Sequence, residues 1–240
     1  MSEIPAPLDS EYPEVAWGLK SGEGKHAPFL IPRPKVTDHA VKFEMLYCGI
    51  CHSDIHLGKN EFSAVIPTSY PFVGGHELLG RVTEIGDKVT KFKVGDYCAV
   101  GCFIDSCKEC HNCRKGEEQY CMNEMTGTFN GDKKHGRVGG NQSTKTFGGY
   151  SGANTVHEDY VIKIPDEMEK DKAAPLMCAG ITMYSPLMYF GAGTEEKKTV
   201  GIIGVGNILF MNLKINCVPK LFHGFRWPWY NGNQNCQSPW

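Results

Sequence analysis

The chain has 240 residues, of which 41% are hydrophobic and 22% are charged, and its formal net charge is -2. A globular protein of one or two domains is expected from this length and composition. The low net charge argues against the broad basic face that nucleic acids or anionic membranes require, and the longest apolar runs are too short or interrupted to cross a bilayer.

The compartment is predicted from the first twenty residues and from the cysteine content. Acidic residues stand at Glu3, Asp9, Glu11 and Glu14, where a secretory signal peptide needs an apolar core. The chain has 11 cysteines, an odd number, and four of them lie within residues 107–121. We therefore expect a cytoplasmic protein whose thiols bind metal instead of forming disulfides.

The first 175 residues contain strand-like segments between turns rich in Gly and Pro. These segments are short, contain many Val, Ile, Tyr and Phe residues, and cover 41–50, 78–86, 96–103 and 159–165. They predict a mostly β, barrel-like domain. Residues 126–149, rich in Gly, Lys and Thr, are expected to form a long surface loop.

The composition changes twice toward the C-terminus. In residues 171–191, Ala, Leu, Met and Ile recur at helical spacing and Gly191 follows, which predicts a buried connecting helix. From about residue 195 a buried strand is expected to enter a glycine turn. Beyond Glu196 there is no Asp or Glu, and three of the 4 Trp residues fall in the last fourteen positions, so this tail does not continue the preceding pattern.

The strongest metal-binding pattern is "CKECHNCRKGEEQYC", a Cys-x2-Cys-x2-Cys-x7-Cys array. Four thiolates can surround zinc tetrahedrally and leave no open position, so this site is predicted to be structural. Free or oxidised thiols are one alternative, and an iron-sulfur cluster is another, although the seven-residue gap fits no ferredoxin spacing. His111 within the loop is interpreted as a solvated bystander. The proposed ligands are Cys107, Cys110, Cys113 and Cys121.

A second group of potential ligands is scattered along the chain. The segment "CGICHSDIH" starts at Cys48, "GGHELLG" contains His76 and Glu77, and "MCAG" contains Cys178. A catalytic zinc needs three protein ligands and one open position for an alcohol or carbonyl oxygen. One Cys, one His and a distant second Cys meet this need, although a single His or Cys is more often a core or surface residue.

These motifs together resemble the zinc-dependent medium-chain alcohol dehydrogenases, most closely the cinnamyl alcohol dehydrogenase type. The resemblance covers roughly residues 10 to 206 and includes "YCGICHSDIH", "GGHELLGRVTEIG", "KFKVGDYCAVG", the cysteine array, "APLMCAGITMYSPL" and "VGIIGVG" in the same order. It implies a mainly β, GroES-like zinc-binding catalytic domain over residues 1–178. Residues 179–240 would then form a connecting helix, the first strand of a truncated α/β Rossmann domain and an atypical tail.

The resemblance also assigns roles to individual residues near the predicted catalytic zinc. Cys48 becomes a spectator, and Glu77 matches an acidic neighbour that can approach zinc when substrate is absent. Asp54 matches a carboxylate that orients a histidine ligand and raises its basicity. The matching zinc ligands are Cys51, His76 and Cys178.

The implied reaction is the interconversion of small alcohols and aldehydes with NADP(H). Ser53 matches the hydroxyl that takes the alcohol proton, and His56 matches the next member of the relay to solvent. His52 matches a residue that meets the cofactor pyrophosphate. The resemblance further implies one catalytic and one structural zinc, and a homodimer in the family.

One position near these residues departs from the family pattern, and three further residues are assigned to the substrate pocket. The family usually has Pro before the Gly-His-Glu triplet, whereas this chain has Gly74, which should loosen the approach to His76 without removing the ligand. By the same resemblance, Phe62, Phe103 and Ile104 border the substrate pocket, although a plain core role is the alternative.

The cofactor turn is incomplete in the sequence. Gly204 and Gly206 fit the first two glycines of a dinucleotide fingerprint, but Leu209 stands at the third position. Only 34 residues (240 minus 206) follow Gly206, whereas a doubly wound domain needs about 120 to 150. We therefore expect a C-terminally truncated or aberrant family member. The alternative function is a non-catalytic zinc-binding fragment, and a zinc-ribbon nucleic-acid binder is disfavoured by the charge.

Overall fold

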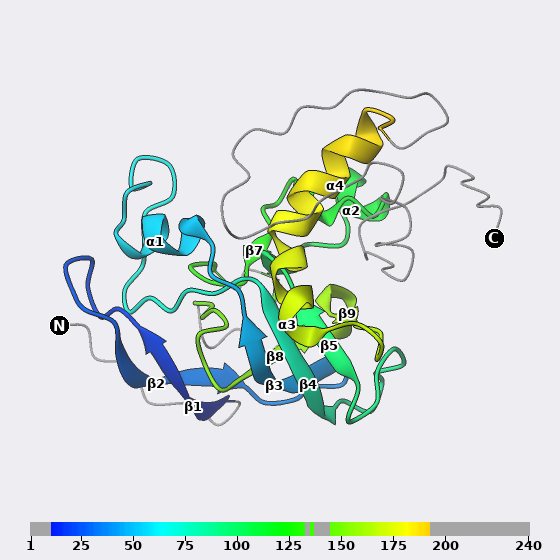
Figure 1. Ribbon diagram of the computed structural model, residues 1–240, viewed down its shortest axis with the longest axis horizontal. Helices are drawn as coiled ribbons and strands as arrows, with labels where there is room; N and C mark the ends of the chain where they lie inside the picture. Colours follow the sequence, from blue (N-terminus) through cyan, green and yellow to red (C-terminus); the bar gives the residue numbers. More distant parts are fainter. Residues whose placement is uncertain (1–10, 133–134, 137–144, 193–240) are drawn as a thin grey trace.

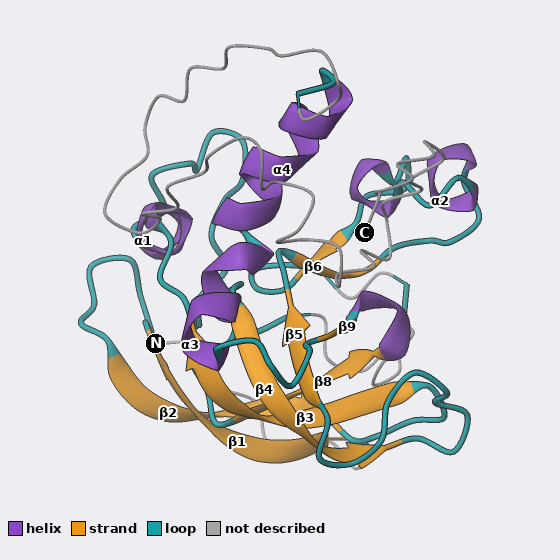
Figure 2. Cartoon of the chain, turned by 45° about the vertical axis from the view of Figure 1, so that its right-hand side comes forward, coloured by secondary structure: helices purple, strands orange, loops and turns teal. Residues whose placement is uncertain are grey.

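The computed structural model describes residues 11–132, 135–136 and 145–192. A five-stranded antiparallel sheet in the order β8-β3-β4-β5-β9 forms its centre. In Figure 2 the strands form a curved layer, with α1, α3 and α4 on one side of it. The central strands are β3 (Ala40–Cys48), β4 (Leu78–Ile85), β5 (Tyr97–Val100), β8 (Ala153–His157) and β9 (Ile162–Lys163).

Two further strand pairs stand beside this sheet (Figure 1). β1 (Glu11–Gly18) pairs antiparallel with β2 (Ala27–Pro34), in a register that places Val15 opposite Leu30. β6 (Phe103–Asp105) pairs with β7 (Thr126–Gly127). β2 contains three prolines in the sequence APFLIPRP, which a two-stranded sheet tolerates because each strand has a free edge.

The helices are short, and most lie in the connections that surround the sheet. The α-helices are α1 (His52–Gly58), α2 (His111–Arg114), α3 (Lys170–Ala173) and α4 (Ala179–Tyr189). The 3-10 turns are η1 (Glu118–Tyr120), η3 (Glu158–Tyr160) and η4 (Ala174–Met177).

β5 and the first residues of β4 are buried on both faces, and this places the later helices. Successive residues of a strand point to opposite faces. Leu78 and Val82 belong to one core, together with Phe43, whereas Leu79 belongs to a second core formed with η4, including Leu176 and Met177. The second core fixes residues 173–177 against the face of the sheet that carries Leu79, which we call its outer face.

The mainly β, GroES-like class predicted from the sequence is confirmed, but two of the predicted strands are wrong in detail. Segment 96–103 is divided between β5 and β6, which pair with different strands. Segment 159–165 contains the end of η3 and only the two residues of β9, because the chain turns at η3. β8, which pairs with β3, precedes this segment.

The helix predicted over 171–191 is interrupted. α3 and η4 end before Cys178, whose backbone angles (φ -123, ψ -72) are not helical, and α4 starts after it. α4 is not buried as expected, since Gly180 is its only buried residue. The surface loop predicted over 126–149 is also partly wrong, because Thr126, Thr128 and Phe147 at its ends are buried by packing against neighbouring segments.

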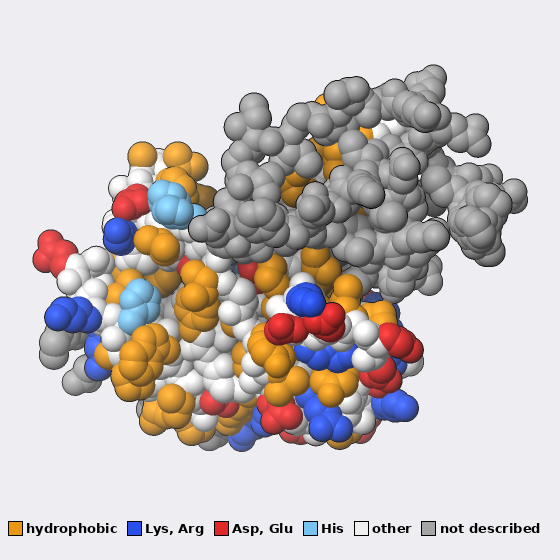
Figure 3. Space-filling view, viewed as in Figure 1, with side chains coloured by type: hydrophobic (Ala, Val, Ile, Leu, Met, Phe, Trp, Pro, Cys, Tyr) orange, Lys and Arg blue, Asp and Glu red, His pale blue; other side chains and the backbone are white. Residues whose placement is uncertain are grey.

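The sequence beyond Ala192, including the predicted cofactor turn and tail, lies outside the described residues. Within the described part, no helix has the length and apolar character needed to cross a membrane. On the face shown in Figure 3, acidic and basic side chains are intermixed over the described residues.

Candidate metal centres

Four side chains from three separate segments meet beside the start of β4. The potential ligand atoms of this cluster, which we call the His76 cluster, all lie within 4.8 Å of one another. Ligands of a tetrahedral zinc lie about 3.5 Å apart, so the cluster needs only small adjustments to hold an ion. Its members are Cys51, His76, Glu77 and Cys178.

The fold brings each member to this place by a local feature. Cys51 precedes the first residue of α1 and caps that helix. His76 and Glu77 directly precede β4, whose pairing with β3 and β5 fixes their position. Cys178 follows η4, and η4 is held on the sheet so closely that a β-carbon on Gly101 would lie 2.9 Å from the Met177 carbonyl.

Asp54 holds the imidazole of His76. Its Oδ1 lies 3.1 Å from His76 Nδ1, and both side chains are buried. Burial acts to raise the pKa of Asp54, but the hydrogen bonds from His76, Gly75 and Cys51 outweigh it and keep this pKa below its usual value. Asp54 is therefore a carboxylate, and its bond to Nδ1 leaves Nε2 of His76 for the cluster.

Glu77 carries the observation that best indicates a cation. Its side chain is buried, and Oε2 has no hydrogen-bond partner among the described residues. Burial, assisted by the charge of Asp54 and opposed by His76, raises the pKa of Glu77 to about 7. An unpaired buried carboxylate is costly, and a metal ion at the neighbouring thiols would offset that cost. The donor set therefore fits zinc.

The three predicted relay and cofactor residues lie on α1. Ser53 Oγ is 3.5 Å from Cys51 Sγ. The rings of His52 and His56 are stacked, with centroids 4.5 Å apart. The ring of Phe62 also packs against His56, with centroids 4.9 Å apart.

Sequence reasoning missed Glu61 and Tyr150. Glu61 is hydrogen-bonded to His56 Nδ1, and that bond lowers the pKa of Glu61. Tyr150 donates its phenol hydrogen to Asp54 Oδ2 at 2.7 Å, across 96 residues of sequence. No spacing or motif in the sequence indicates either contact.

The second group, the four-cysteine cluster of residues 107, 110, 113 and 121, also has its sulfur atoms within 4.8 Å of one another. Cys107 Sγ is 3.5 Å from Cys121 Sγ and 3.8 Å from Cys113 Sγ. Burial acts to raise the pKa of Cys107, but backbone N–H groups of Glu109 and Cys110 outweigh it and lower this pKa to about 6. Four converging sulfur atoms, one of them easily ionised, fit a structural zinc.

The four-cysteine loop is fastened to the β domain by polar contacts. Lys108 Nζ lies 2.9 Å from Glu118 within the loop and 3.3 Å from Asp159 of η3. Cys113 donates to Ser106 Oγ at 3.4 Å, and Ser106 in turn is 2.8 Å from the Tyr160 hydroxyl. The loop is therefore tied to η3 at two points.

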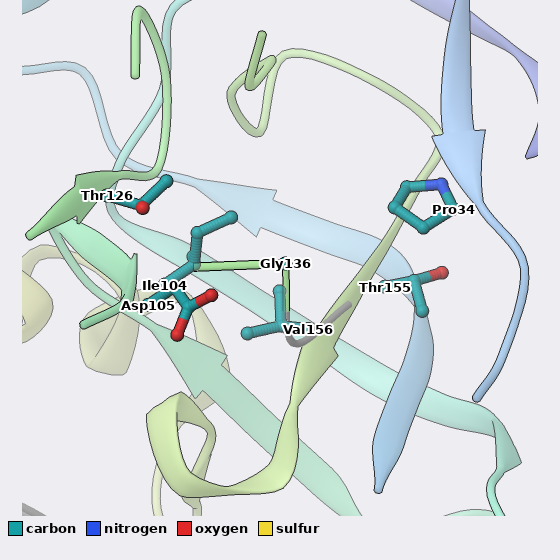
Figure 4. A pocket seen from close by; sticks show the side chains of 7 residues that line it. All are labelled: Pro34, Ile104, Asp105, Thr126, Gly136, Thr155 and Val156. Atoms are coloured by element: carbon teal, nitrogen blue, oxygen red, sulfur yellow. The ribbon is translucent and has the colours of Figure 1, made fainter. Parts of the chain in front are cut away.

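The remaining predicted residues lie apart from both clusters or cannot be placed. Cys48 belongs to neither cluster, and His111 is exposed, as interpreted from the sequence. Phe103 belongs to the central core. Gly204 and Gly206 lie outside the described residues. Figure 4 shows a separate pocket that shares no residue with either cluster and is lined by Pro34, Ile104, Asp105, Thr126, Gly136, Thr155 and Val156.

Comparison with known families accounts for this arrangement. Residues 37–166 match the model of the alcohol dehydrogenase GroES-like domain. The chain belongs to this family. The matched span includes β3, α1, the start of β4 and the whole four-cysteine loop, but ends before Cys178.

Curated alcohol dehydrogenases are similar to this chain over most of its length. An NADP-dependent alcohol dehydrogenase C of Mycolicibacterium smegmatis is 50% identical over 186 residues, which are 77% of this chain and 50% of that relative. A probable cinnamyl alcohol dehydrogenase of Arabidopsis thaliana is 42% identical over 208 residues, 87% of this chain and 54% of that relative. The chain thus spans about half the length of the curated relatives it matches.

Solved alcohol dehydrogenases have the same fold. A cinnamyl alcohol dehydrogenase from Sorghum bicolor superimposes with a TM-score of 0.69 at 39% identity, over 75% of this chain and 48% of that one. The corresponding enzyme from Helicobacter pylori, complexed with NADP(H), gives a TM-score of 0.69 at 36% identity, over 76% and 50% of the two chains. The resemblance to the cinnamyl alcohol dehydrogenase type is therefore confirmed.

Proposed function

We propose that this chain is a zinc-dependent oxidoreductase that interconverts small alcohols and aldehydes with NADP(H). The His76 cluster is the single observation that carries this proposal, because it combines two thiols, an imidazole and a buried unpaired carboxylate. The relatives named as NADP-dependent and cinnamyl alcohol dehydrogenases support the reaction class.

Cys51, His76 and Cys178 would hold the catalytic zinc, with Glu77 as an alternating neighbour. When bound, zinc supplies a Lewis acid that polarises an alcohol or carbonyl oxygen. The chain's contribution is to fix the three ligands: α1, the start of β4 and the break after η4 each present one of them. Cys107, Cys110, Cys113 and Cys121 would hold a structural zinc with no open position.

α1 provides the proton route in this proposal. Ser53 Oγ, next to Cys51, accepts the proton of a bound alcohol. His56 is only half-buried and is hydrogen-bonded to Glu61, so it can pass a proton to solvent. His52, exposed on the same helix, and the outlying Gly204 and Gly206 would contact NADP(H), which supplies or accepts the hydride.

The organisation of the whole molecule follows from the same proposal. Residues 1–178 would form the catalytic domain, and residues 179–240 the connecting helix and the start of the dinucleotide-binding part. We place the protein in the cytoplasm, acting on a small-molecule alcohol or aldehyde, without nucleic-acid or membrane partners. The net charge of -2 is consistent with this assignment.

Titration with NADPH followed by fluorescence anisotropy tests the proposal. We expect saturable binding, and NADPH oxidation when an aromatic aldehyde such as cinnamaldehyde is added. Ser53→Ala should bind NADPH normally and reduce the aldehyde about 100-fold more slowly. If the intact chain does not bind NADPH at about millimolar concentration, a range above typical cofactor affinities, it is instead a non-catalytic zinc-binding fragment.

A further inference from the structure

The carboxylate of Asp54 accepts four hydrogen bonds, and three of the donors belong to the segments that carry the proposed ligands. Oδ1 accepts from Gly75 N at 2.8 Å and lies 3.1 Å from His76 Nδ1, while Oδ2 accepts from Cys51 N at 3.0 Å. The fourth donor, the phenol of Tyr150, bonds Oδ2 at 2.7 Å from a segment that carries no ligand. Tyr150 therefore holds the Asp54 carboxylate from a segment that contributes none of the proposed ligands.

The segment of Tyr150 runs beside the segment that leads to His76. Tyr150 N donates to Gly74 O at 3.1 Å, Gly149 N to Gly75 O at 2.9 Å, and Gly148 N to Val73 O at 2.8 Å. A β-carbon on Gly74 would lie 3.1 Å from Tyr150 Cε2 and 3.3 Å from Asp54 Oδ1. The absence of a side chain at Gly74 therefore leaves room for the phenol above the carboxylate.

A buried arginine holds the same segment before and after Tyr150. Arg33, only 3% exposed, donates to Phe147 O at 2.5 Å, to Gly148 O at 2.6 Å and to Ser151 Oγ at 2.6 Å. Burying a guanidinium is costly unless its donors are used. Here Nη1 and Nη2 hold the chain on either side of Tyr150, which fixes the position from which the phenol reaches Asp54.

We propose that Tyr150 is a positioning residue of the His76 cluster, which fixes the Asp54 carboxylate and through it the imidazole that binds metal. This inference rests on the proposed function. A hydrogen-bonded carboxylate restricts the ring of a histidine ligand and raises its basicity, and removal of such a support typically weakens metal binding about 10–100-fold. The phenol acts one step further out, so a loss near the lower end of that range is expected.

The test compares Tyr150→Phe with Tyr70→Phe in the full chain. Tyr70 donates its hydroxyl to Gly58 O at 2.8 Å, at the far end of the same helix α1, so both variants lose one phenol hydrogen bond and keep the ring. Zinc affinity is measured by competition with a chelator, and the four-cysteine cluster serves as an internal reference. We expect Tyr150→Phe to weaken only the His76 cluster, about tenfold, and Tyr70→Phe to leave both sites unchanged.

Cobalt(II) substitution adds a spectroscopic readout, because its d–d absorption reports ligand geometry. The bands of the Cys-His-Cys site should shift in Tyr150→Phe only. A double-mutant cycle with Asp54→Ala, which removes the acceptor, tests the route: if Tyr150 acts through Asp54, adding Tyr150→Phe to Asp54→Ala should cause no further loss. If Tyr150→Phe also lowers the stability of the protein, it does so with and without the Asp54 substitution, and this effect cancels in the cycle.

Two results overturn the inference. Wild-type affinity and an unshifted cobalt spectrum in Tyr150→Phe would reject Tyr150 as a positioning residue while leaving the proposed function intact. An equal loss at both metal sites would show that the phenol serves only general stability. If the wild-type chain binds one zinc, held by the four cysteines, the proposed function and this inference both fail.

Discussion

Gly49 lies directly against the carboxylate of Glu77. A β-carbon at position 49 would overlap Oε2 of Glu77, and Gly49 N donates to the Glu77 carbonyl at 3.0 Å. Glu77 is buried, so its carboxylate would have to shift within the cluster to admit a side chain at position 49. Gly49 is therefore needed for the shape of the His76 cluster, although it bears no ligand atom.

Gly49→Ala should displace Glu77 and damage the His76 cluster. Overpacking of this kind costs about 1–3 kcal/mol of unfolding free energy, and we expect a loss of zinc from this site but not from the four-cysteine cluster. Zinc retention during dialysis against a chelator measures the effect. Gly24→Ala, in an exposed turn where the nearest atom is 3.1 Å away, is the control. Equal zinc retention in the two variants would contradict the account.

The second core should control Cys178, because Met177 and its neighbours pack on the outer face of β4. Leu79 and Val82 lie on opposite faces of this strand and are 0% and 1% exposed. Truncation of either to Ala should cost about 2–4 kcal/mol. Only Leu79→Ala should also increase the rate at which the His76 cluster releases zinc. A similar release rate in Val82→Ala would show that the loss follows general stability.

Asp159 should make stability depend on pH. Burial acts to raise its pKa, but the hydrogen bond from Lys91 and the charges of Lys108, Lys91 and His157 outweigh this and lower the pKa to about 2. The unfolded value is about 3.9, so the contribution is present above about pH 4 and is lost as the pH falls toward 2.

Asp159→Asn tests this contribution by urea unfolding. Because the side chain is 34% exposed, solvent screening reduces the expected loss to about 1 kcal/mol near pH 7. The difference from wild type should shrink as the pH falls from about 5 to 3. Asp38→Asn, which removes an exposed ion pair with Lys88, should have no measurable effect. A difference that stays constant with pH would refute the assignment.

The four-cysteine loop and the polar residues of α1 could be predicted from the sequence because their spacing is local. The four-cysteine loop depends on gaps of two and seven residues, and α1 carries consecutive polar residues. The structure brings both groups together as the motifs suggested, and their metal binding stays a prediction. Cys178 was named from the sequence as a distant candidate ligand, but no local spacing tied it to the others, since its position depends on the packing of η4 on β4.

The errors have physical causes in the chain's long-range contacts. The prolines of β2 obscured a strand that a two-stranded sheet accepts. The helical period of 171–191 gave no sign of the break at Cys178. The support from Tyr150 to Asp54 spans 96 residues, and a lone tyrosine has no local pattern that reveals its hydrogen-bond partner.

Zinc content per chain is the most direct measurement of whether the chain has two zinc sites formed by independent sets of ligands. We expect two zinc ions in the wild-type protein, and one each in Cys178→Ser and Cys110→Ser, retained by the cluster left intact. His111→Ala, at an exposed histidine that belongs to neither cluster, should keep both ions. A wild-type content of one zinc, or an unchanged content in Cys178→Ser, would contradict the account.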